Sequence, residues 1–449
     1  MKISVTNLGP IKEASVELGG LTVFVGPNGT GKSYLAKVIY GLQRHEAFMA
    51  SYFSNAERFY QVLFDKSMGT GQEVLMDLKQ LKSADFGQAI PKLVNLHAEL
   101  FKDRLSSYFN DDEKLFKNTT ISFSYTVSLP DEQDLQKNIA GAVEFAKRRT
   151  GEDISPVDLF WGFCWYLFWG AGGGLAEYFP AARSNFMLTY KEIYRARADE
   201  HVGMEIIPDW LLPASKSQQM RKTGKLVRFD KPTEDFISRL YDLDSSEMSP
   251  LATISVELQK RLYGDDRIVV EQSEGQLPDF RYQIHDTESK IRLHLTSSMV
   301  TETSPLLMGF WYWIQPDSLV IIDEPESHLH PEAQKALVNG LAVAINQGLR
   351  VILITHSPYI LSCVNNLIKF GSLLKNFPDD ANVAKFKNDH IDMVALEKNV
   401  TAYHFGRDGM VKDIVLTSGL IDESEFTEPF DKINELYESM RDIEWDHRR

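Results

Sequence analysis

The amino-acid sequence predicts an α/β fold whose open sheet carries a ligand site at one edge. Three short apolar β-type runs support this prediction, at residues 21–25, 318–322 and 349–354. Each run is followed by residues suited to binding or cleaving a phosphate. Since open α/β sheets place ligand chemistry at the carboxyl ends of their strands, we expect the residues after the three runs to meet around one ligand.

The first run leads into a phosphate-binding loop. The loop fits the pattern G-x-x-x-x-G-K-[ST] at every fixed position, with Gly26, Pro27, Asn28, Gly29, Thr30, Gly31, Lys32 and Ser33. Glycines let such a loop curl around an anion with its N–H groups pointing inward. Residues 34–42 have the composition of the helix that must follow, and its positive end would face the phosphates. The pattern predicts a nucleoside triphosphate site, with Lys32 at the β- and γ-phosphates and the Ser33 hydroxyl on Mg²⁺.

Two carboxylates and a histidine follow the other two runs. Asp323 and Glu324 come at the end of the second run, where Asp323 is expected to support Mg²⁺ and Glu324 to polarise the attacking water. His356 follows the third run and is positioned to sense the γ-phosphate. An acidic loop or a structural histidine would explain either segment alone, but the P-loop favours the catalytic interpretation of both.

Two further motifs resemble a known family. Residues 323–331 read Asp-Glu-Pro-Glu-Ser-His-Leu-His-Pro, and residues 355–358 read Thr-His-Ser-Pro. Together they resemble the ABC-class ATPases of the SMC, RecF and OLD kind, whose first hairpin is similar to residues 5–14. Residues 179–184, Phe-Pro-Ala-Ala-Arg-Ser, resemble a segment of the AAA-type branch that includes bacterial anti-phage ATPases. The resemblance implies an ABC-type P-loop ATPase head that binds ATP with Mg²⁺.

A signature loop in that family contacts the γ-phosphate of the nucleotide held by the opposite subunit. The corresponding segment here is 295–302, in which the hydroxyls of Ser297 and Ser298 are the expected donors. Met299 stands where the family has glycine, and its side chain would hinder a close backbone approach to phosphate. The sequence therefore leaves two interpretations of this segment open, a nucleotide contact in trans and an ordinary Ser/Thr-rich loop.

The domain organisation follows from the distance between the P-loop (Walker A) and the acidic strand (Walker B). Residues 1–45 and 265–420 are expected to form a split ATPase core, and residues 46–264 a mostly helical insertion between Walker A and Walker B. A β-type patch at 119–127 interrupts the helical pattern. No heptad repeat is long enough for extended coiled-coil arms. Residues 421–449 are acidic and have the spacing of a C-terminal helix.

Composition and cysteine content indicate a soluble, globular chain. Its 449 residues include 43% hydrophobic and 25% charged residues, enough to bury a large core. Cys164 and Cys363 offer no disulfide framework and no metal spacing, and the N-terminus shows no signal peptide, so we expect a cytoplasmic protein. The aromatic run 160–169 is shorter than the roughly 20 residues of a membrane span. A buried helix is therefore favoured over a partner surface there, and no membrane contact is predicted.

The charge balance bears on nucleic-acid binding. The formal net charge is −15, from 48 basic and 63 acidic residues, which disfavours a protein coated with nucleic acid. Local basic patches remain possible sites of contact at 147–149, at Arg195 with Arg197, and from Lys216 to Arg228. Since no aromatic residues are interleaved with the last patch, a solvated surface is the favoured interpretation.

The sequence predicts a stand-alone, ATP-hydrolysing switch. No second catalytic constellation appears, and the chain ends soon after a predicted closing hairpin at 400–415, without the metal-binding nuclease domain of OLD-like proteins. The family resemblance implies a homo-oligomer, at least a dimer, with ATP held between protomers. It also implies an anti-phage role in which the chain holds a separate effector, such as a nuclease, and releases it.

Two other functions compete with this prediction. One is a DNA repair or recombination ATPase of the RecF or SMC type that clamps DNA directly, for which salt-sensitive DNA binding would be diagnostic. The other is an ATP-bound scaffold that hydrolyses weakly, which Met299 motivates.

Overall fold

A six-stranded sheet forms the centre of the fold. The computed structural model describes residues 1–124, 131–151, 154–168, 176–200, 229–273, 276–424, 426, 435, 437–438 and 440. The strands of the central sheet are β3 (Leu21–Val25), β5 (Ala176–Phe179), β9 (Leu319–Asp323), β10 (Arg350–Thr355), β11 (Val400–Phe405) and β12 (Val411–Asp413). Their order is β12-β11-β3-β10-β9-β5, and all neighbours are parallel except β12, which is antiparallel to β11. The predicted α/β fold, with a mostly parallel sheet and the P-loop after β3, is therefore confirmed.

The register of this sheet brings the three predicted strand ends together. Val25 at the end of β3 is level with Thr355 of β10, and Asp323 at the end of β9 is level with Ile354. Because β10 lies between β3 and β9, the P-loop, the acidic pair and His356 all leave the sheet at one edge.

The strands of the sheet alternate their side chains between two hydrophobic cores. On β3, Val23 and Val25 point to one core and Phe24 to the other, and Ile321 and Ile322 of β9 divide in the same way. This alternation follows from the two-residue period of a strand, and burial on both faces explains why these strands read as continuous apolar runs.

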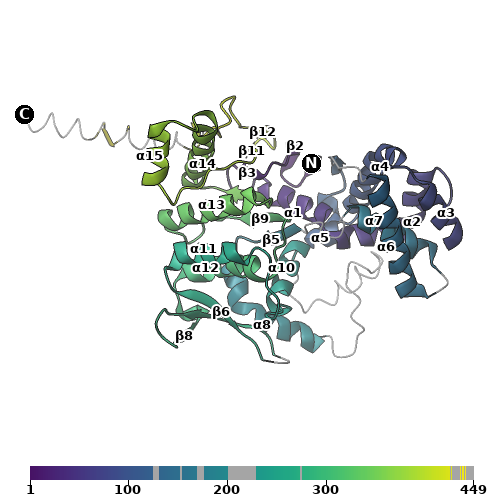
Figure 1. Cartoon of the computed structure of the whole chain (residues 1–449), viewed down its shortest axis with the longest axis horizontal. Helices are drawn as coiled ribbons and strands as arrows, with labels where there is room; N and C mark the ends of the chain where they lie inside the picture. The colour runs from purple at the N-terminus through teal and green to yellow at the C-terminus, as the bar shows by residue number, and fades with distance from the viewer. Residues whose placement is uncertain are drawn as a thin grey trace, which may run out of the picture.

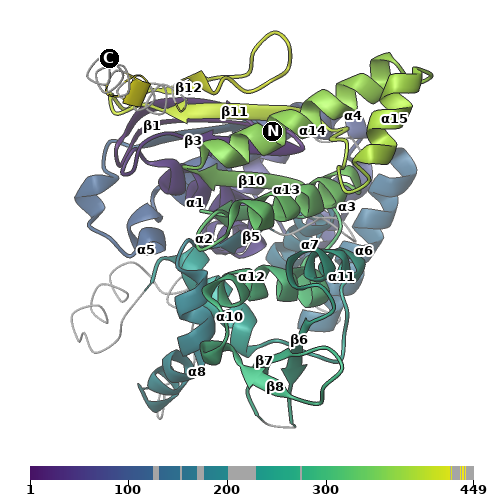
Figure 2. The same cartoon turned by 90° about the vertical axis from the view of Figure 1, so that its left-hand side faces the viewer.

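Helices cover both faces (Figure 1). The first core is built with α1 (Lys32–Gln43), α2 (His45–Phe64), α3 (Gly71–Gln80), α4 (Ser83–Lys102), α5 (Leu105–Phe109), α6 (Glu132–Thr150) and α7 (Pro156–Phe168). The second core is built with α8 (Arg183–Glu200), α10 (Lys231–Tyr241), α11 (Ala252–Tyr263), α12 (Ser298–Met308), α13 (Pro331–Asn346) and α14 (Pro358–Asn376). Figure 2 shows α13 and α14 running across the sheet, and α15 (Ala381–Asp389) packs on α14 through Phe386 and Phe370.

Two smaller antiparallel sheets flank the central one. The first contains β1 (Lys2–Leu8), β2 (Ile11–Glu17) and β4 (Thr120–Ser124), and the second contains β6 (Arg267–Glu271), β7 (Asp279–Gln283) and β8 (Lys290–Arg292). The first hairpin predicted from the sequence is thus present as β1 and β2, which pair directly.

Residues 46–264, predicted as a helical insertion, contribute strands to the same sheets as residues 1–45 and 265–420 and share their hydrophobic core. β5 and β4 both lie within residues 46–264, yet β5 is the edge strand of the central sheet and β4 pairs with β1. The boundaries predicted at residues 46 and 264 therefore do not follow the sheets. The reason is that β5 spans only Ala176–Phe179, which is too short to show a strand pattern, and its four residues are all buried.

Parts of several predicted segments lie outside the described residues. They are the end of the β-type patch at 125–127, the end of the aromatic run at Trp169, the basic stretch from Lys216 to Arg228 and most of the acidic tail. Within α7, the side chains of Phe160, Trp161 and Phe163 are at most 4% exposed, so this part of the aromatic run belongs to the core. Of the helices that the structure describes, none has the length and apolarity of a membrane span.

Candidate nucleotide-binding site

The P-loop joins β3 to α1 in a shape that depends on glycine. Gly26 has φ 134° and Gly31 has φ 96°, backbone conformations that residues with a side chain rarely adopt. A Cβ atom at Gly26 would also lie 2.5 Å from the Phe405 carbonyl oxygen. Gly31 caps the start of α1 without any side-chain hydrogen bond to the helix, so the first N–H groups of α1 remain available to an anion.

Lys32 bends back over this loop. Its Nζ donates to the carbonyl oxygens of Gly26 at 2.9 Å and Pro27 at 2.7 Å, and the residue is only 4% exposed. Burial lowers the pKa of Lys32 to about 8, although the nearby carboxylates of Asp323 and Glu324 act in the opposite direction. The negative charge of a bound polyphosphate would stabilise the protonated form of Lys32.

Asp323 and Ser33 meet as predicted for a magnesium site. The Asp323 carboxylate accepts hydrogen bonds from the hydroxyls of Ser33 and Tyr178, the latter at 2.9 Å. Burial raises the pKa of Asp323, and these two hydrogen bonds oppose that rise. Among the described residues no group of three or more His, Cys, Asp or Glu side chains could hold a metal alone. A hydroxyl beside one carboxylate fits Mg²⁺ that takes its remaining ligands from nucleotide phosphates and water.

Glu324 occupies a strained turn directly after β9. Its φ is 49°, in the left-handed region that costs a residue with a side chain about 1–3 kcal/mol. The Glu324 N–H donates to the Ile354 carbonyl at 2.9 Å, and its carboxylate accepts from the Ser327 hydroxyl at 3.0 Å. This turn aims Glu324 away from the strand direction, beside the end of β10.

His356 contacts both the P-loop and the acidic turn. Its ring donates to the Gly26 carbonyl, and its backbone N–H donates to Glu326 Oε1 at 2.7 Å. Burial, together with the positive charge of Lys32, lowers the pKa of His356. The imidazole is therefore neutral at pH 7, and its one N–H points to the Gly26 carbonyl.

Among the described residues, Ser297 and Ser298 form no hydrogen bond with the P-loop of their own chain. Both are exposed at the start of α12, where the Ser297 hydroxyl caps the helix by accepting the Val300 N–H at 3.4 Å. No hydrogen bond or ion pair joins either serine to residues 26–33, all of which the structure describes. Met299 packs against the second hydrophobic core, so its side chain turns toward the protein interior.

Three contributors to this site could not be predicted from sequence. Tyr178 on β5 binds Asp323, Glu326 binds the backbone of His356, and Arg183 donates to the Asp323 carbonyl at 2.7 Å. Glu326 also keeps its Oε2 atom buried without a hydrogen-bond partner in the structure. Residues 179–184, which include Arg183, were noticed only through their resemblance to other ATPases. Nothing in the sequence indicates that the strand before them lies beside β9.

Comparison with known proteins finds a family match over part of the chain. Residues 215–362 match the family described as "AAA domain, putative AbiEii toxin, Type IV TA system". No curated protein matches the chain. Solved structures that match include an SMC head bound to the C-terminal winged-helix domain of ScpA, at 12% identity and a TM-score of 0.33, over 92% of this chain and 96% of that one. Another is an SMC head from Pyrococcus furiosus with an extended coiled coil, bound to the C-terminal domain of ScpA, at 13% identity and a TM-score of 0.30, over 98% of both chains. Residues 215–362 are thus similar to an AAA domain, and the chain combines them with a P-loop and a mostly parallel sheet.

Proposed function

We propose that this chain binds ATP with Mg²⁺, hydrolyses it, and uses the cycle as a switch. The observation that carries the proposal is the convergence of Lys32, Asp323, Glu324 and His356 from three adjacent strand ends. The charges of Asp323 and Glu324 act to raise the pKa of Lys32, and the charge of Lys32 helps to lower the pKa of His356. One bound triphosphate would contact all of them.

Each side chain has a role that its surroundings support. The loop amides and the start of α1 cradle the phosphates, and Lys32 turns from its carbonyl partners to the β- and γ-phosphates. Ser33 and Asp323 would hold Mg²⁺, which neutralises charge on the transferred phosphoryl group. Glu324 orients and deprotonates the attacking water, and His356 would sense the γ-phosphate by turning its N–H from the Gly26 carbonyl to a phosphate oxygen.

Ser297 and Ser298 suit a role between subunits. They are exposed and form no hydrogen bond with their own P-loop, which the structure describes in full, so they could contact the γ-phosphate in a second copy of the chain. Because Met299 packs inward, it does not stand beside the two hydroxyls as an obstacle. A homodimer, or a larger homo-oligomer, that sandwiches ATP follows from this arrangement.

The biological setting that we favour is anti-phage defence with a separate effector protein, such as a nuclease. The description of the family that residues 215–362 match names a putative AbiEii toxin and a type IV TA system, which supports this setting. The net charge of −15 disfavours the alternative of a clamp that binds DNA directly.

The defence proposal is tested by purification with the neighbouring genes expressed, with and without Mg-ATP. We expect a stoichiometric protein partner whose association changes with Mg-ATP, and no such change in Lys32→Ala, which lacks the phosphate contact. Recovery of DNA alone would favour the clamp. An association that Mg-ATP leaves unchanged would contradict the switch.

A further inference from the structure

Arg183 is a buried cation that joins two parts of the protein. It is the first residue of α8, which follows β5 after residues 180–182, and it is 2% exposed, although arginine is among the residues least often buried. On one side its Nη1 donates to the Asp323 carbonyl at 2.7 Å, and its Nη2 donates to the Glu324 carbonyl at 3.2 Å. The guanidinium thus holds the backbone of the two residues whose carboxylates serve the nucleotide site.

On the other side the same guanidinium holds helix α12. Its Nε donates to the Glu302 carbonyl at 3.0 Å, and its Nη2 lies 2.9 Å from Glu302 Oε1. Glu302 is completely buried, in the second turn of the helix that Ser297 caps. One planar group therefore links the acidic turn to the helix that presents Ser297 and Ser298.

The chemistry of this pair is costly for a purely structural contact. Burying two charges requires their desolvation, and apolar residues of similar volume often stabilise a core as well or better. The Glu302 carboxylate oxygens also lack aligned hydrogen bonds, so the 2.9 Å contact is mainly electrostatic. Arg183 also donates to the carbonyl of Glu324, which lies in a strained turn. Because the guanidinium is planar and rigid, it can transmit a shift of that turn to helix α12.

We propose that Arg183 and Glu302 form a positioning pair that couples the occupancy of the nucleotide site to helix α12 and its exposed serines. A triphosphate that engages Asp323 and Glu324 moves or fixes their turn. The guanidinium follows their carbonyls and carries Glu302 with it. Helix α12 would then present Ser297 and Ser298 in one arrangement when the site is filled and in another when it is empty.

This proposal rests on the proposed function only for nucleotide binding, not for hydrolysis. It is therefore tested with the non-hydrolysable analogue AMP-PNP and Mg²⁺, by hydrogen exchange of the segments 26–33 and 295–302. The measurement is made at a dilution where sedimentation shows a single protomer, so that contacts between copies do not contribute. In the native protein we expect AMP-PNP to slow exchange in both segments, by about tenfold in the second.

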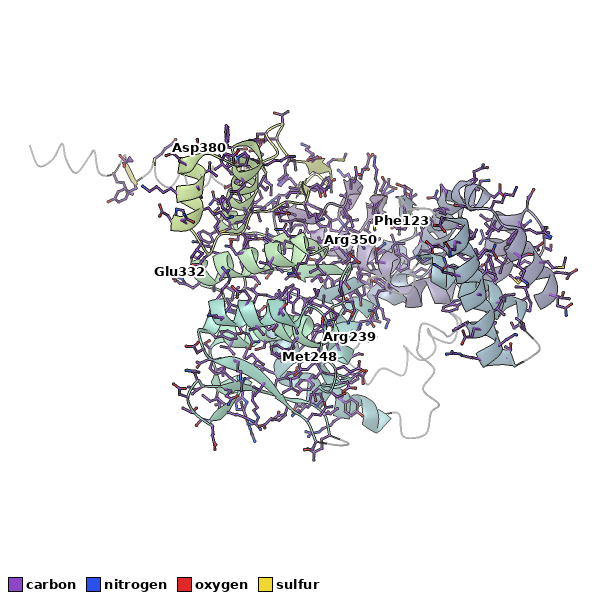
Figure 3. The ribbon with its side chains drawn as sticks, in the orientation of Figure 1. Phe123, Arg239, Met248, Glu332, Arg350 and Asp380 are labelled. Carbon is purple, nitrogen blue, oxygen red and sulfur yellow. The ribbon has the colours of Figure 1, made fainter. Side chains whose placement is uncertain are left out.

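Arg183→Lys keeps the positive charge but loses the planar guanidinium that donates to several carbonyls at once. We expect this variant to slow exchange at 26–33 as the native protein does and to lose the response at 295–302. The matched control is Arg239→Lys (Arg239 is labelled in Figure 3). Arg239 forms an ion pair at 2.6 Å with Glu177, a buried residue of β5, although its own side chain is 35% exposed. Among the described residues it makes no hydrogen bond or ion pair with the acidic turn or with α12. This control should keep both responses.

A second variant covers the case in which Arg183→Lys does not fold. Arg183→Met combined with Glu302→Met removes both charges and keeps the volume, so no unpaired charge is left in the core. It should fold, bind AMP-PNP and lack the response at 295–302. An undiminished response in either folded variant would overturn the coupling. If AMP-PNP does not slow exchange at 26–33 in the native protein, nucleotide binding itself is contradicted.

Discussion

At the scale of single residues, Lys32 holds its charge against burial. Its pKa is lowered to about 8, so at pH 8 about half of the nucleotide-free protein carries an uncharged Lys32. A bound triphosphate favours the charged form and raises this pKa again. Binding at pH 8 should therefore take up about half a proton per site, and affinity should fall as the pH rises above 8.

Calorimetry in two buffers of different ionisation enthalpy measures this proton uptake. Lys32→Arg is the control, because arginine stays charged over the whole range. His356 does not contribute to the proton uptake at pH 8, since its lowered pKa keeps it neutral there. Equal uptake by the native protein and Lys32→Arg would show that Lys32 is not the group that titrates.

We expect Tyr178 to set the acid sensitivity of Mg-ATP binding. Its hydroxyl donates to Asp323 at 2.9 Å and thereby opposes the rise in the Asp323 pKa that burial causes. Asp323 must be ionised to hold Mg²⁺, so binding is lost as the pH falls through its pKa. Tyr178→Phe removes the opposing hydrogen bond, and its Mg-ATP affinity should start to fall at a higher pH than in the native protein.

Tyr40→Phe provides a matched comparison for Tyr178→Phe. Tyr40 is also buried, and its hydroxyl donates at 2.9 Å to a carboxylate outside the site, that of Asp235. The dissociation constant for Mg-ATP is measured as a function of pH for both variants. If the two profiles shift alike, Tyr178 acts on stability and not on Asp323.

At the scale of elements, α1 connects the P-loop to the helical segment. Gly41 near its end faces α4, where an added Cβ would lie 2.4 Å from Phe101 Cζ. Phe101 is 2% exposed, so its ring has little room to move. Gly41→Val should therefore lower the free energy of unfolding by about 1–3 kcal/mol, which denaturant unfolding measures.

A double-mutant cycle with Phe101→Ala isolates this contact. The cavity left by Phe101→Ala should accept the valine, so the two changes together should cost less than the sum of their separate costs. Additive costs would mean that the strain at Gly41 arises elsewhere.

The elements that sequence predicts are those whose pattern is local. β3, β9 and β10 are apolar runs because the central sheet buries both their faces, and the P-loop motif fixes the turn between β3 and α1. β5 has only four residues, and its place beside β9 depends on a pairing between residues more than a hundred positions apart. Tyr178 and Arg183 reach the site through that pairing, so their roles could not be predicted.

At the scale of the whole molecule, the sheet separates two cores that meet the site from opposite sides. The first core contains α1 and the helices α2–α7, and the second contains α12 with its exposed serines. The Arg183–Glu302 pair gives the nucleotide site a direct connection to the second core. A filled and an empty site would thus differ at a surface suited to a second copy of the chain.

Steady-state phosphate release tests whether this chain hydrolyses ATP with Glu324 as the base. The native protein should turn over Mg-ATP, and Glu324→Gln should lose at least about a hundredfold of that rate while its nucleotide affinity stays the same. Equal rates of phosphate release from the two proteins would contradict the claim and favour an ATP-bound scaffold.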